Sequence, residues 1–300
     1  MNLAMVNNLW AVMQKGEGNQ YQFGAENQYT LTVARSPEER RQAWARVYQS
    51  YREQGYVAEK ADGLWCNLHD ALPSTTTFFV SRGDTVVGAL SVVFDSPFRL
   101  PADELYHAEL DVLRAKGRRL CEIISLANDD KEGRGCLEIL KEMFRMAYLT
   151  ARKEEGCTDI VITVNPHHVA YYERRLMFDR AGEERRYEKV AGAPAVLLAL
   201  DLTTAEERYI AAYGTKENSL FRHFCLRDNE AGLCRMIREG RRPEMLLALA
   251  AWFRAYRPFI WNAARTAWNG VDSAGAGGET DAQLLDDAAM PLCNGAVAGR

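Results

Sequence analysis

The stretch from residue 118 to residue 178 decides the fold of this chain. It begins with RRLCEIISLAN (residues 118–128) and closes with NPHHVAYYERRLMF (residues 165–178). Between them lie a charged loop, a long amphipathic segment (136–155) and an apolar run (159–164). This order predicts two parallel strands joined by a crossover helix, and ligands collect at the carboxyl ends of such strands.

Composition limits the class of protein. The chain has 300 residues, of which 47% are hydrophobic and 26% charged, and its net charge is -4. These values are typical of a soluble globular protein without a general attraction to nucleic acid or anionic membranes. The 7 cysteines form no CxxC pair, so we expect neither a disulfide framework nor a zinc site, and a cytoplasmic location suits them best. We expect neither a signal peptide nor a transmembrane segment.

The flanking segments complete an α/β sheet of about seven strands with helices on both sides. Alternating apolar residues predict strands at 29–35, 75–82, 85–94, 180–190 and 195–202. A capping box at Ser36 opens a helix that ends near Gly55, and a second helix covers 101–116. The irregular segment 56–73 is either a functional loop or a surface flap, and we favour the flap.

The domain organisation follows from changes in composition. We expect a mobile arm at 1–28, a main domain at 29–202, a helical extension at 203–269 and a disordered tail at 270–300. The predicted helices of the extension cover 205–213, 219–226, 230–239, 244–256 and 258–268. We interpret the amphipathic stretch 245–261 as a packing or dimer face, with a lipid cover or a peripheral membrane contact as alternatives.

Glu122 is the first candidate for chemistry, because it lies inside an apolar strand that is predicted to be central. Burial without a partner is costly for a carboxylate and raises its pKa toward the range of a general base. A structural ion pair with an arginine is the alternative, and the residues alone leave it open.

The loop 128–135 and the helix after it carry a second candidate site. Backbone amides at a helix N-terminus attract phosphate, and Gly133 and Gly135 permit close approach, although a plain glycine-rich turn is the alternative. One face of the helix carries basic residues, either as a solvated row or as a docking surface for an acidic protein. These residues are Arg134, Lys141, Arg145 and Arg152.

His168 and Tyr172 form a third candidate, because they are four residues apart on one face of a helix. Either side chain can orient or protonate a reacting group, or the pair can simply close the core. His167 is adjacent to His168, and no third ligand stands at a recognisable spacing. We therefore expect no metal site.

Together these stretches resemble the long-chain N-acyl amino acid synthases, a branch of the GNAT acyltransferase fold related to acyl-homoserine-lactone synthases. The resemblance covers residues 29–202 and rests on the order and spacing of short pieces. These are Val87-Gly88, Asp95-Ser96, LPADELY (100–106), GRRLCE (117–122), Leu126-Ala127, VNPHH (164–168), Tyr171-Tyr172 and APAVLL (193–198).

The resemblance implies a mixed, splayed sheet and transfer of a fatty acyl group from an acyl carrier protein thioester to the α-amine of an amino acid. It implies no tightly bound cofactor, because the acyl-phosphopantetheine arm of the carrier is itself the donor and lies where the central strands separate. Glu122 resembles the acid that accepts the proton of the amine. The acyl-thioester pocket would contain Leu126, Ala127, Asn165, His168 and Tyr172. The carrier protein and its arm would meet Gly133, Arg134, Gly135, Lys141 and Arg145.

Two alternatives belong to other classes. One is a coenzyme A-dependent N-acetyltransferase of a small amine, but Asp130 stands where the GNAT pyrophosphate loop usually begins with Gln or Arg, and this suits a carrier protein. The other is a non-enzymatic GNAT-like module that binds an acyl carrier protein or lipid. The acceptor and the acyl chain length are not determined, because an apolar pocket separates chain lengths by only about 0.8 kcal/mol per methylene.

Overall fold

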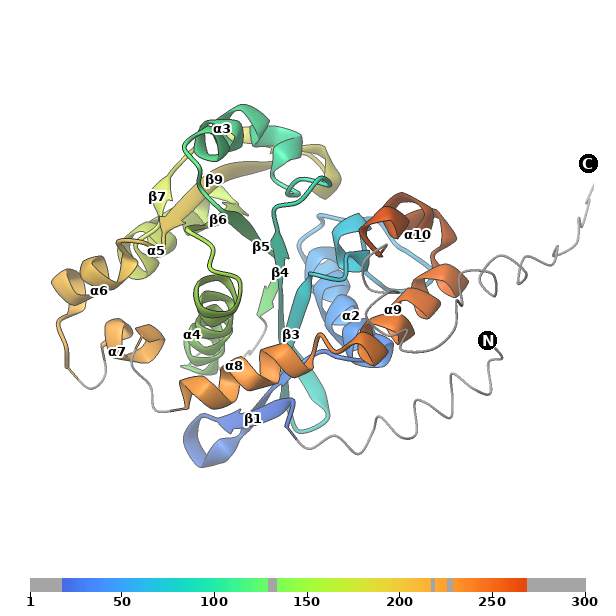
Figure 1. The fold of residues 1–300 in the computed structure, drawn as a ribbon, viewed down its shortest axis with the longest axis horizontal. Helices are drawn as coiled ribbons and strands as arrows, with labels where there is room; N and C mark the ends of the chain where they lie inside the picture. Colours follow the sequence, from blue (N-terminus) through green and yellow to red (C-terminus); the bar gives the residue numbers. More distant parts are fainter. Residues whose placement is uncertain (1–17, 129–133, 217–218, 226–228, 269–300) are drawn as a thin grey trace, which may run out of the picture.

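The computed structural model describes residues 18–128, 134–216, 219–225 and 229–268. Within these ranges the strands form a nine-stranded sheet in the order β1-β2-β3-β4-β5-β6-β9-β7, and β8 pairs with β9. Neighbouring strands are antiparallel except for the central pair of β5 (Leu120–Asn128) and β6 (Asp159–Val164), which is parallel. Figure 1 shows this mixed sheet with helices on both sides, which confirms the predicted α/β architecture.

Most of the other strands and helices lie close to the ranges predicted from the sequence. The remaining strands are β1 (Gln20–Phe23), β2 (Tyr29–Val33), β3 (Thr76–Arg82), β4 (Thr85–Phe94), β7 (Asp179–Arg180), β8 (Arg185–Tyr187) and β9 (Ala193–Asp201). The helices beside the sheet are α2 (Pro37–Glu53), α3 (Asp103–Ala115), α4 (Arg134–Tyr148) and α5 (Pro166–Leu176), and α4 continues as the π-helix η3 (Leu149–Glu154). The extension contains α6 (Ala205–Tyr213), α7 (Leu220–Cys225), α8 (Glu230–Glu239), α9 (Pro243–Tyr256) and α10 (Pro258–Ala264). In the described part of the chain, no helix is long and apolar enough to cross a membrane.

Two expectations about the sheet are wrong in part. Gln20–Phe23, which we expected within a mobile arm, form β1 and pair with β2. The single strand expected at 180–190 is broken, because the amides of Ala181 and Gly182 both donate to the carbonyl of Leu197, which interrupts the ladder. The strand resumes as β8 and ends in a 3-10 turn, η4 (Glu188–Val190). Residues 1–17 of the expected arm and the expected tail at 270–300 lie outside the described residues.

The two parallel strands separate halfway along. Their register runs from Leu120 opposite Asp159 to Ile123 opposite Ile162, and beyond this point β5 and β6 continue without pairing. The cause is a β-bulge, because two residues of β5 (Ser125 and Leu126) oppose one residue of β4 (Leu90) and Ser125 has a φ of 53°. A bulge bends its strand and increases its twist. The predicted splaying of the central strands is therefore a local event at Ser125.

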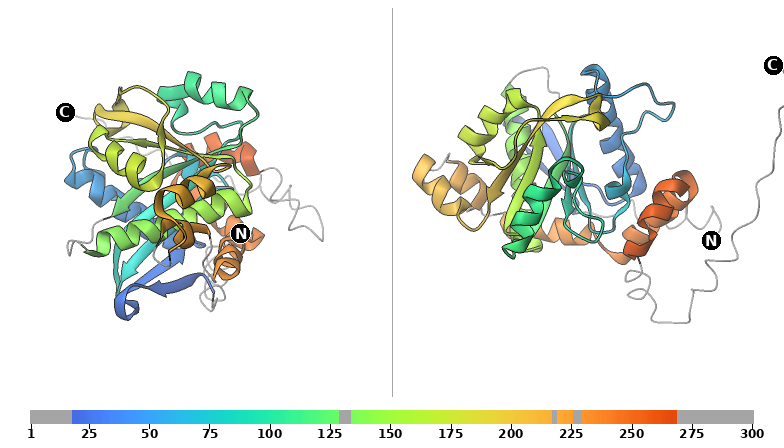
Figure 2. Two further views of the ribbon diagram at one scale, coloured as in Figure 1. Left: turned by 90° about the vertical axis from the view of Figure 1, so that its left-hand side faces the viewer. Right: turned by 90° about the horizontal axis from the view of Figure 1, so that it is seen from above.

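Helices cover the two faces of the sheet with apolar side chains. α4 contributes Ile139 and Met143 to the main core, and it approaches β4 closely because Gly88 has no side chain. A Cβ at Gly88 would lie 2.9 Å from Cγ2 of Ile139. On the opposite face, α2 packs Ala43 and Val47 against the sheet. Figure 2 shows from the side that the sheet lies between these helices.

The helical extension packs against the main domain at two places. Leu233 and Ile237 of α8 join the main core beside α4. Phe253 of α9 and Trp268, which follows α10, bury in a second cluster around Trp44 of α2, and the Trp268 ring donates to the carbonyl of Ala71 at 3.1 Å. Figure 1 shows α9 and α10 on the far side of the molecule from α6 and α7. The extension is therefore integrated with the main domain through α8 and through α9 and α10.

Arg145 links α4 to the extension and does not face solvent. Its side chain is 1% exposed, and Nη2 donates to Oδ1 of Asn229, the residue that precedes α8, at 2.7 Å. Nη1 lies 3.9 Å from Glu142, a buried carboxylate that also accepts the hydroxyl of Tyr21 in β1. This cluster joins β1, α4 and the start of α8, so the role of Arg145 is structural.

We predict that Arg145→Met lowers the free energy of unfolding by about 3 kcal/mol, because it removes a buried cation from beside the Glu142 carboxylate. Chemical denaturation followed by circular dichroism measures the change. Lys141→Met on the same helix, where the side chain is half-buried, is the matched control and should change the value by less than about 0.5 kcal/mol. Equal effects of the two substitutions would contradict the structural role of Arg145.

Candidate active site

Glu122 is the centre of the candidate site. Alternation along β5 places Cys121 and Ile123 in the core beneath α4 and turns Glu122 to the other face, where its side chain is 3% exposed. Its Oε2 accepts the backbone N–H of Ala102 at 2.7 Å. Among the described residues, no lysine or arginine forms an ion pair with it. The alternative of a structural ion pair therefore has no partner in this part of the chain.

The surroundings of Glu122 favour its neutral form. Burial raises the pKa of the Glu122 carboxyl to about 8, and the nearby charge of Asp103 adds to this effect. Three groups favour the ionised form but only partly offset the effect of burial on the pKa. They are the Ala102 N–H, the charge of Lys189 and the Thr163 hydroxyl. The Thr163 hydroxyl makes no well-aligned hydrogen bond among the described residues. A carboxyl that titrates near neutral pH is suited to accept a proton during catalysis.

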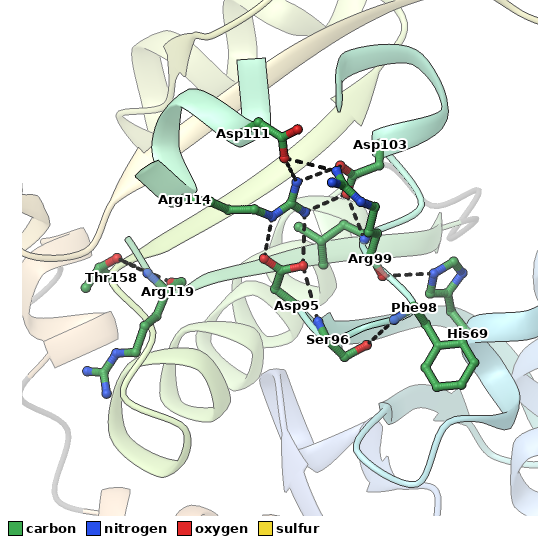
Figure 3. Close-up of polar contacts among 11 residues, drawn as sticks. His69, Asp95, Ser96, Phe98, Arg99, Asp103, Asp111, Arg114, Arg119 and Thr158 are labelled. Carbon is green, nitrogen blue, oxygen red and sulfur yellow. Dashed lines mark hydrogen bonds and ion pairs between the residues drawn. The ribbon is translucent and has the colours of Figure 1, made fainter. Parts of the chain in front are cut away.

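A charge network holds the segment that reaches Glu122, and Figure 3 shows its members. Arg114 of α3 places its guanidinium between two carboxylates, with Nε 2.6 Å from Oδ2 of Asp95 and Nη2 2.6 Å from Oδ2 of Asp103. The same Asp103 oxygen accepts the backbone N–H of Leu100 at 2.9 Å. This network therefore fixes the turn 95–103 and so aims the N–H of Ala102 at Glu122. Sequence reasoning missed this network, although Asp95 and Asp103 lie just before and at the start of α3 and Asp111, which also pairs with Arg114, lies three residues before that arginine.

Two tyrosines from separate elements lie within electrostatic range of the same carboxylate. Burial raises the pKa of Tyr51 of α2 to about 12, and the charges of Tyr56, Asp70 and Glu122 add to this effect. Burial also raises the pKa of Tyr187 of β8, again with a contribution from Glu122. Neither tyrosine was a candidate from the sequence, because nothing in its local pattern places it beside β5.

The irregular segment 56–73 borders this site. Tyr56 and Trp65 pack against Tyr51 with ring centroids 5.9 and 5.1 Å apart, respectively. At its end, His69 hydrogen-bonds the carbonyl of Arg99 at 3.1 Å, so this segment contacts the turn that reaches Glu122 (Figure 3). The segment therefore forms a wall of the candidate site, a position that favours the functional interpretation over a remote surface flap.

The structure brings only some of the expected pocket residues together. Leu126 packs toward α4, whereas Ala127 is buried toward α2, so the two lie on opposite faces of β5. Asn165 caps α5, and its Nδ2 lies 3.5 Å from the hydroxyl of Tyr56. It therefore connects the end of β6 to the wall formed by segment 56–73.

His168 and Tyr172 have different surroundings although they share a helix. Tyr172 is 6% exposed and packs between Phe144 and Phe178, with ring centroids 5.8 and 5.9 Å away. Burial raises the pKa of Tyr172, and the charges of Tyr171 and Tyr51 add to this effect. His168 is exposed beside His167 at the start of α5. The pair therefore does not act as one unit inside the core.

The residues expected to meet the carrier protein also separate. Gly133 lies outside the described residues, Arg134 begins α4, and Gly135 is buried in the first turn. Lys141 is half-buried. The expectation that Arg145 faces solvent with them is wrong, because α8 and Asn229 cover it. Within the described ranges, no cluster of His, Cys, Asp or Glu could hold a metal ion.

Comparisons with known proteins agree with this architecture. The family model of the N-acyl amino acid synthase FeeM matches residues 42–201. The solved structure of FeeM, an N-acyl amino acid synthase from uncultured soil microbes, is 28% identical, with a TM-score of 0.53 over 61% of this chain and 96% of that chain. The AHL synthase LasI is 17% identical, with a TM-score of 0.44 over 59% of this chain and 93% of that chain. An N-acetyltransferase from Staphylococcus aureus Mu50 is 13% identical, with a TM-score of 0.40 over 58% of this chain and 98% of that chain. No curated protein sequence matches the chain.

The fold is therefore that of a GNAT-type acyltransferase, with its central strands parted beside a buried carboxylate. The family model spans more than half of the chain, which belongs to the FeeM family of N-acyl amino acid synthases. The resemblance found in the sequence is confirmed, and the protein is an N-acyltransferase.

We predict that Glu122→Gln stabilises the protein increasingly as the pH rises. The folded pKa of about 8 exceeds the ordinary value of 4.5, so the folded state binds the proton more tightly than the unfolded state. Stability from this group is therefore present at low pH and is lost as the pH rises toward 8. The midpoint of thermal unfolding of the variant, relative to the wild type, should increase between about pH 5 and about pH 8. The exposed control Glu207→Gln should follow the wild type, and a constant difference for Glu122→Gln would contradict the raised pKa.

Proposed function

We propose that this enzyme transfers a long-chain fatty acyl group from an acyl carrier protein thioester to the α-amine of an amino acid. The observation that carries the proposal is Glu122, a buried carboxylate with a pKa of about 8 that lies on β5 just before β5 and β6 separate. Membership of the FeeM family supports the same reaction class.

Glu122 acts as the general base in this proposal. The Ala102 N–H occupies Oε2, which leaves Oε1 to accept a proton, directly or through water. The neutral amine nitrogen attacks the thioester carbonyl and gives up one N–H proton to Glu122 as the new C–N bond forms, and the C–S bond then breaks. The proton on Glu122 is returned to the departing thiolate of the phosphopantetheine arm. A base of this kind contributes about two orders of magnitude or more to the rate.

The donor arm fits the place where the strands separate. Beyond Ile123 and Ile162, the facing backbone edges of β5 and β6 no longer pair with each other. An extended arm that carries amide groups can hydrogen-bond such an edge as an added strand does. α4 begins beside this opening and α5 follows β6, so the acyl chain would meet the apolar side chains beneath them. No bound cofactor is needed, because the arm brings the activated acyl group.

Lys189 is suited to bind the carboxylate of the acceptor. Its charge lowers the pKa of Glu122, and its ammonium pairs with Glu104, two residues after the Ala102 that contacts Glu122. Its side chain is 52% exposed, so an incoming substrate can reach it. An α-amino acid carries its carboxylate one carbon from its amine. An amino acid whose amine lies at Glu122 therefore places its carboxylate near Lys189.

We predict that Glu122→Gln lowers turnover at least about a hundredfold, because glutamine keeps the Ala102 hydrogen bond but cannot accept the proton. Mass spectrometry of N-acyl amino acid products, formed from acylated carrier protein and mixed amino acids, measures the rate. The wild type should also show a rise in kcat/KM with pH near 8 that the variant lacks. Glu207→Gln is the control. Unchanged turnover would remove Glu122 from the mechanism, and turnover with acetyl-CoA alone would overturn the proposed donor.

We predict that Lys189→Met raises the KM for the amino acid about tenfold, because one charge-assisted hydrogen bond is lost. The KM for acylated carrier protein should not change, and neither should the rate with an amine that has no carboxylate. The exposed Lys216→Met is the matched control. An equal loss with the carboxylate-free amine would show that Lys189 does not read the carboxylate.

A further inference from the structure

The turn between α9 and α10 exposes two aromatic side chains. Phe259 is 88% exposed and Tyr256 is 57% exposed, and Phe259 has the largest exposed fraction of the large hydrophobic residues in the described part of the chain. The inner face of the same helices is well packed, because Phe253 and Trp268 are 0% and 2% exposed. The helices are therefore firmly docked. Tyr256 still packs against Trp252 with ring centroids 5.7 Å apart, whereas Phe259 makes no ring contact among the described residues.

The charges around these rings are almost all positive. From Met245 to Trp268 the chain has three arginines and no aspartate or glutamate. Arg254 and Arg265 are exposed, and Arg254 lies over the ring of Trp261 at 5.0 Å. Arg257 packs over Trp252 at 5.5 Å and pairs with Asp62, the acidic group that faces this turn from segment 56–73. The remaining positive charge is available to an anionic surface.

The position of this turn suits a broad surface. We name residues 254–265 the aromatic elbow. Figures 1 and 2 place α9 and α10 at the periphery of the molecule, away from the parted strands of the sheet. The elbow belongs to the extension, outside the residues 42–201 that the family model matches. A function of the elbow is therefore separate from the acyl transfer site.

We propose that the aromatic elbow docks this enzyme on a lipid surface that contains anionic headgroups. Rings at the level of the headgroups bury their apolar faces, and flanking arginines contact lipid phosphates. Each such basic residue adds an attraction that salt weakens. The overall charge of -4 opposes a general attraction to such a surface, so the local patch has to provide the binding. A lipid surface is favoured over a protein because exposed guanidinium groups and rings are interleaved on a turn at the periphery of the molecule (Figure 1).

Flotation of the full-length protein with vesicles tests this proposal. The vesicles contain either phosphatidylcholine alone or phosphatidylcholine mixed with phosphatidylglycerol, at low and high salt. We expect binding to the anionic vesicles that decreases with salt. Phe259→Ser should weaken binding about tenfold or more, because one exposed ring no longer inserts. Arg254→Gln combined with Arg265→Gln should remove the preference for anionic vesicles.

Val112→Ser is the matched control, because Val112 is 54% exposed on α3, far along the chain from the elbow. It should bind vesicles as the wild type does, and all variants should unfold at the same temperature because the substituted side chains are exposed. No binding to either vesicle, or an equal loss with Val112→Ser, would overturn the proposal. Light scattering gives the oligomeric state of the wild type and of Phe259→Ser. A dimeric wild type that does not bind vesicles, together with a monomeric variant, would overturn the proposal and assign the elbow to self-association. Vesicle binding needs no acyl donor, so the result does not depend on the proposed function.

Discussion

The left-handed backbone at Ser125 is the constraint on which the rest of the site depends. It gives β5 one residue more than β4 at this point, and beyond it β5 and β6 no longer pair. A non-glycine residue in this conformation is strained, and the Ser125 hydroxyl is buried without a hydrogen-bond partner among the described residues. Such strain persists where the surrounding structure enforces it, and it is concentrated at functional sites. Here the strained backbone at Ser125 separates β5 from β6, which would otherwise continue to pair by hydrogen bonds.

The gap between β5 and β6 is suited to catalysis because the Glu122 carboxylate lies beside it. Glu122 is buried with one backbone N–H and no ion pair among the described residues, an arrangement that costs stability and raises its pKa to about 8. Interactions elsewhere offset this loss of stability. Arg114 binds Asp95 and Asp103 and so holds the turn whose Ala102 N–H donates to Glu122. A proton acceptor, a bordering wall of aromatic residues and an unpaired strand edge are thus brought together by one bend and one charge network.

The extension contributes to the same arrangement in an indirect way. Phe253 and Trp268 pack against Trp44 and Leu72, and segment 56–73 in turn contacts the turn before α3 through His69. In the middle of the extension, the start of α8 covers the guanidinium of Arg145. The extension lies outside the region shared with the family model, yet it shapes both faces of the domain. Its outer surface is free to take a separate role, and the aromatic elbow is where its composition departs most from an ordinary solvated face.

The sequence alone predicted the elements and the central residue, because their signals are local. The apolar strand around Glu122 predicts burial, the capping box at Ser36 marks a helix start, and the spacing of 118–178 predicts a parallel pair. Arg145 shows the limit of this reasoning, because its helical position beside Lys141 suggests a solvated face and only the docking of α8 decides that it is buried. The partner of Glu122 is likewise set by tertiary structure. Ala102 is twenty residues away, and its N–H reaches the carboxylate only after the Arg114 network has folded the turn over β5. Local periodicity determines which residues are buried, and long-range packing determines which of the buried groups meet.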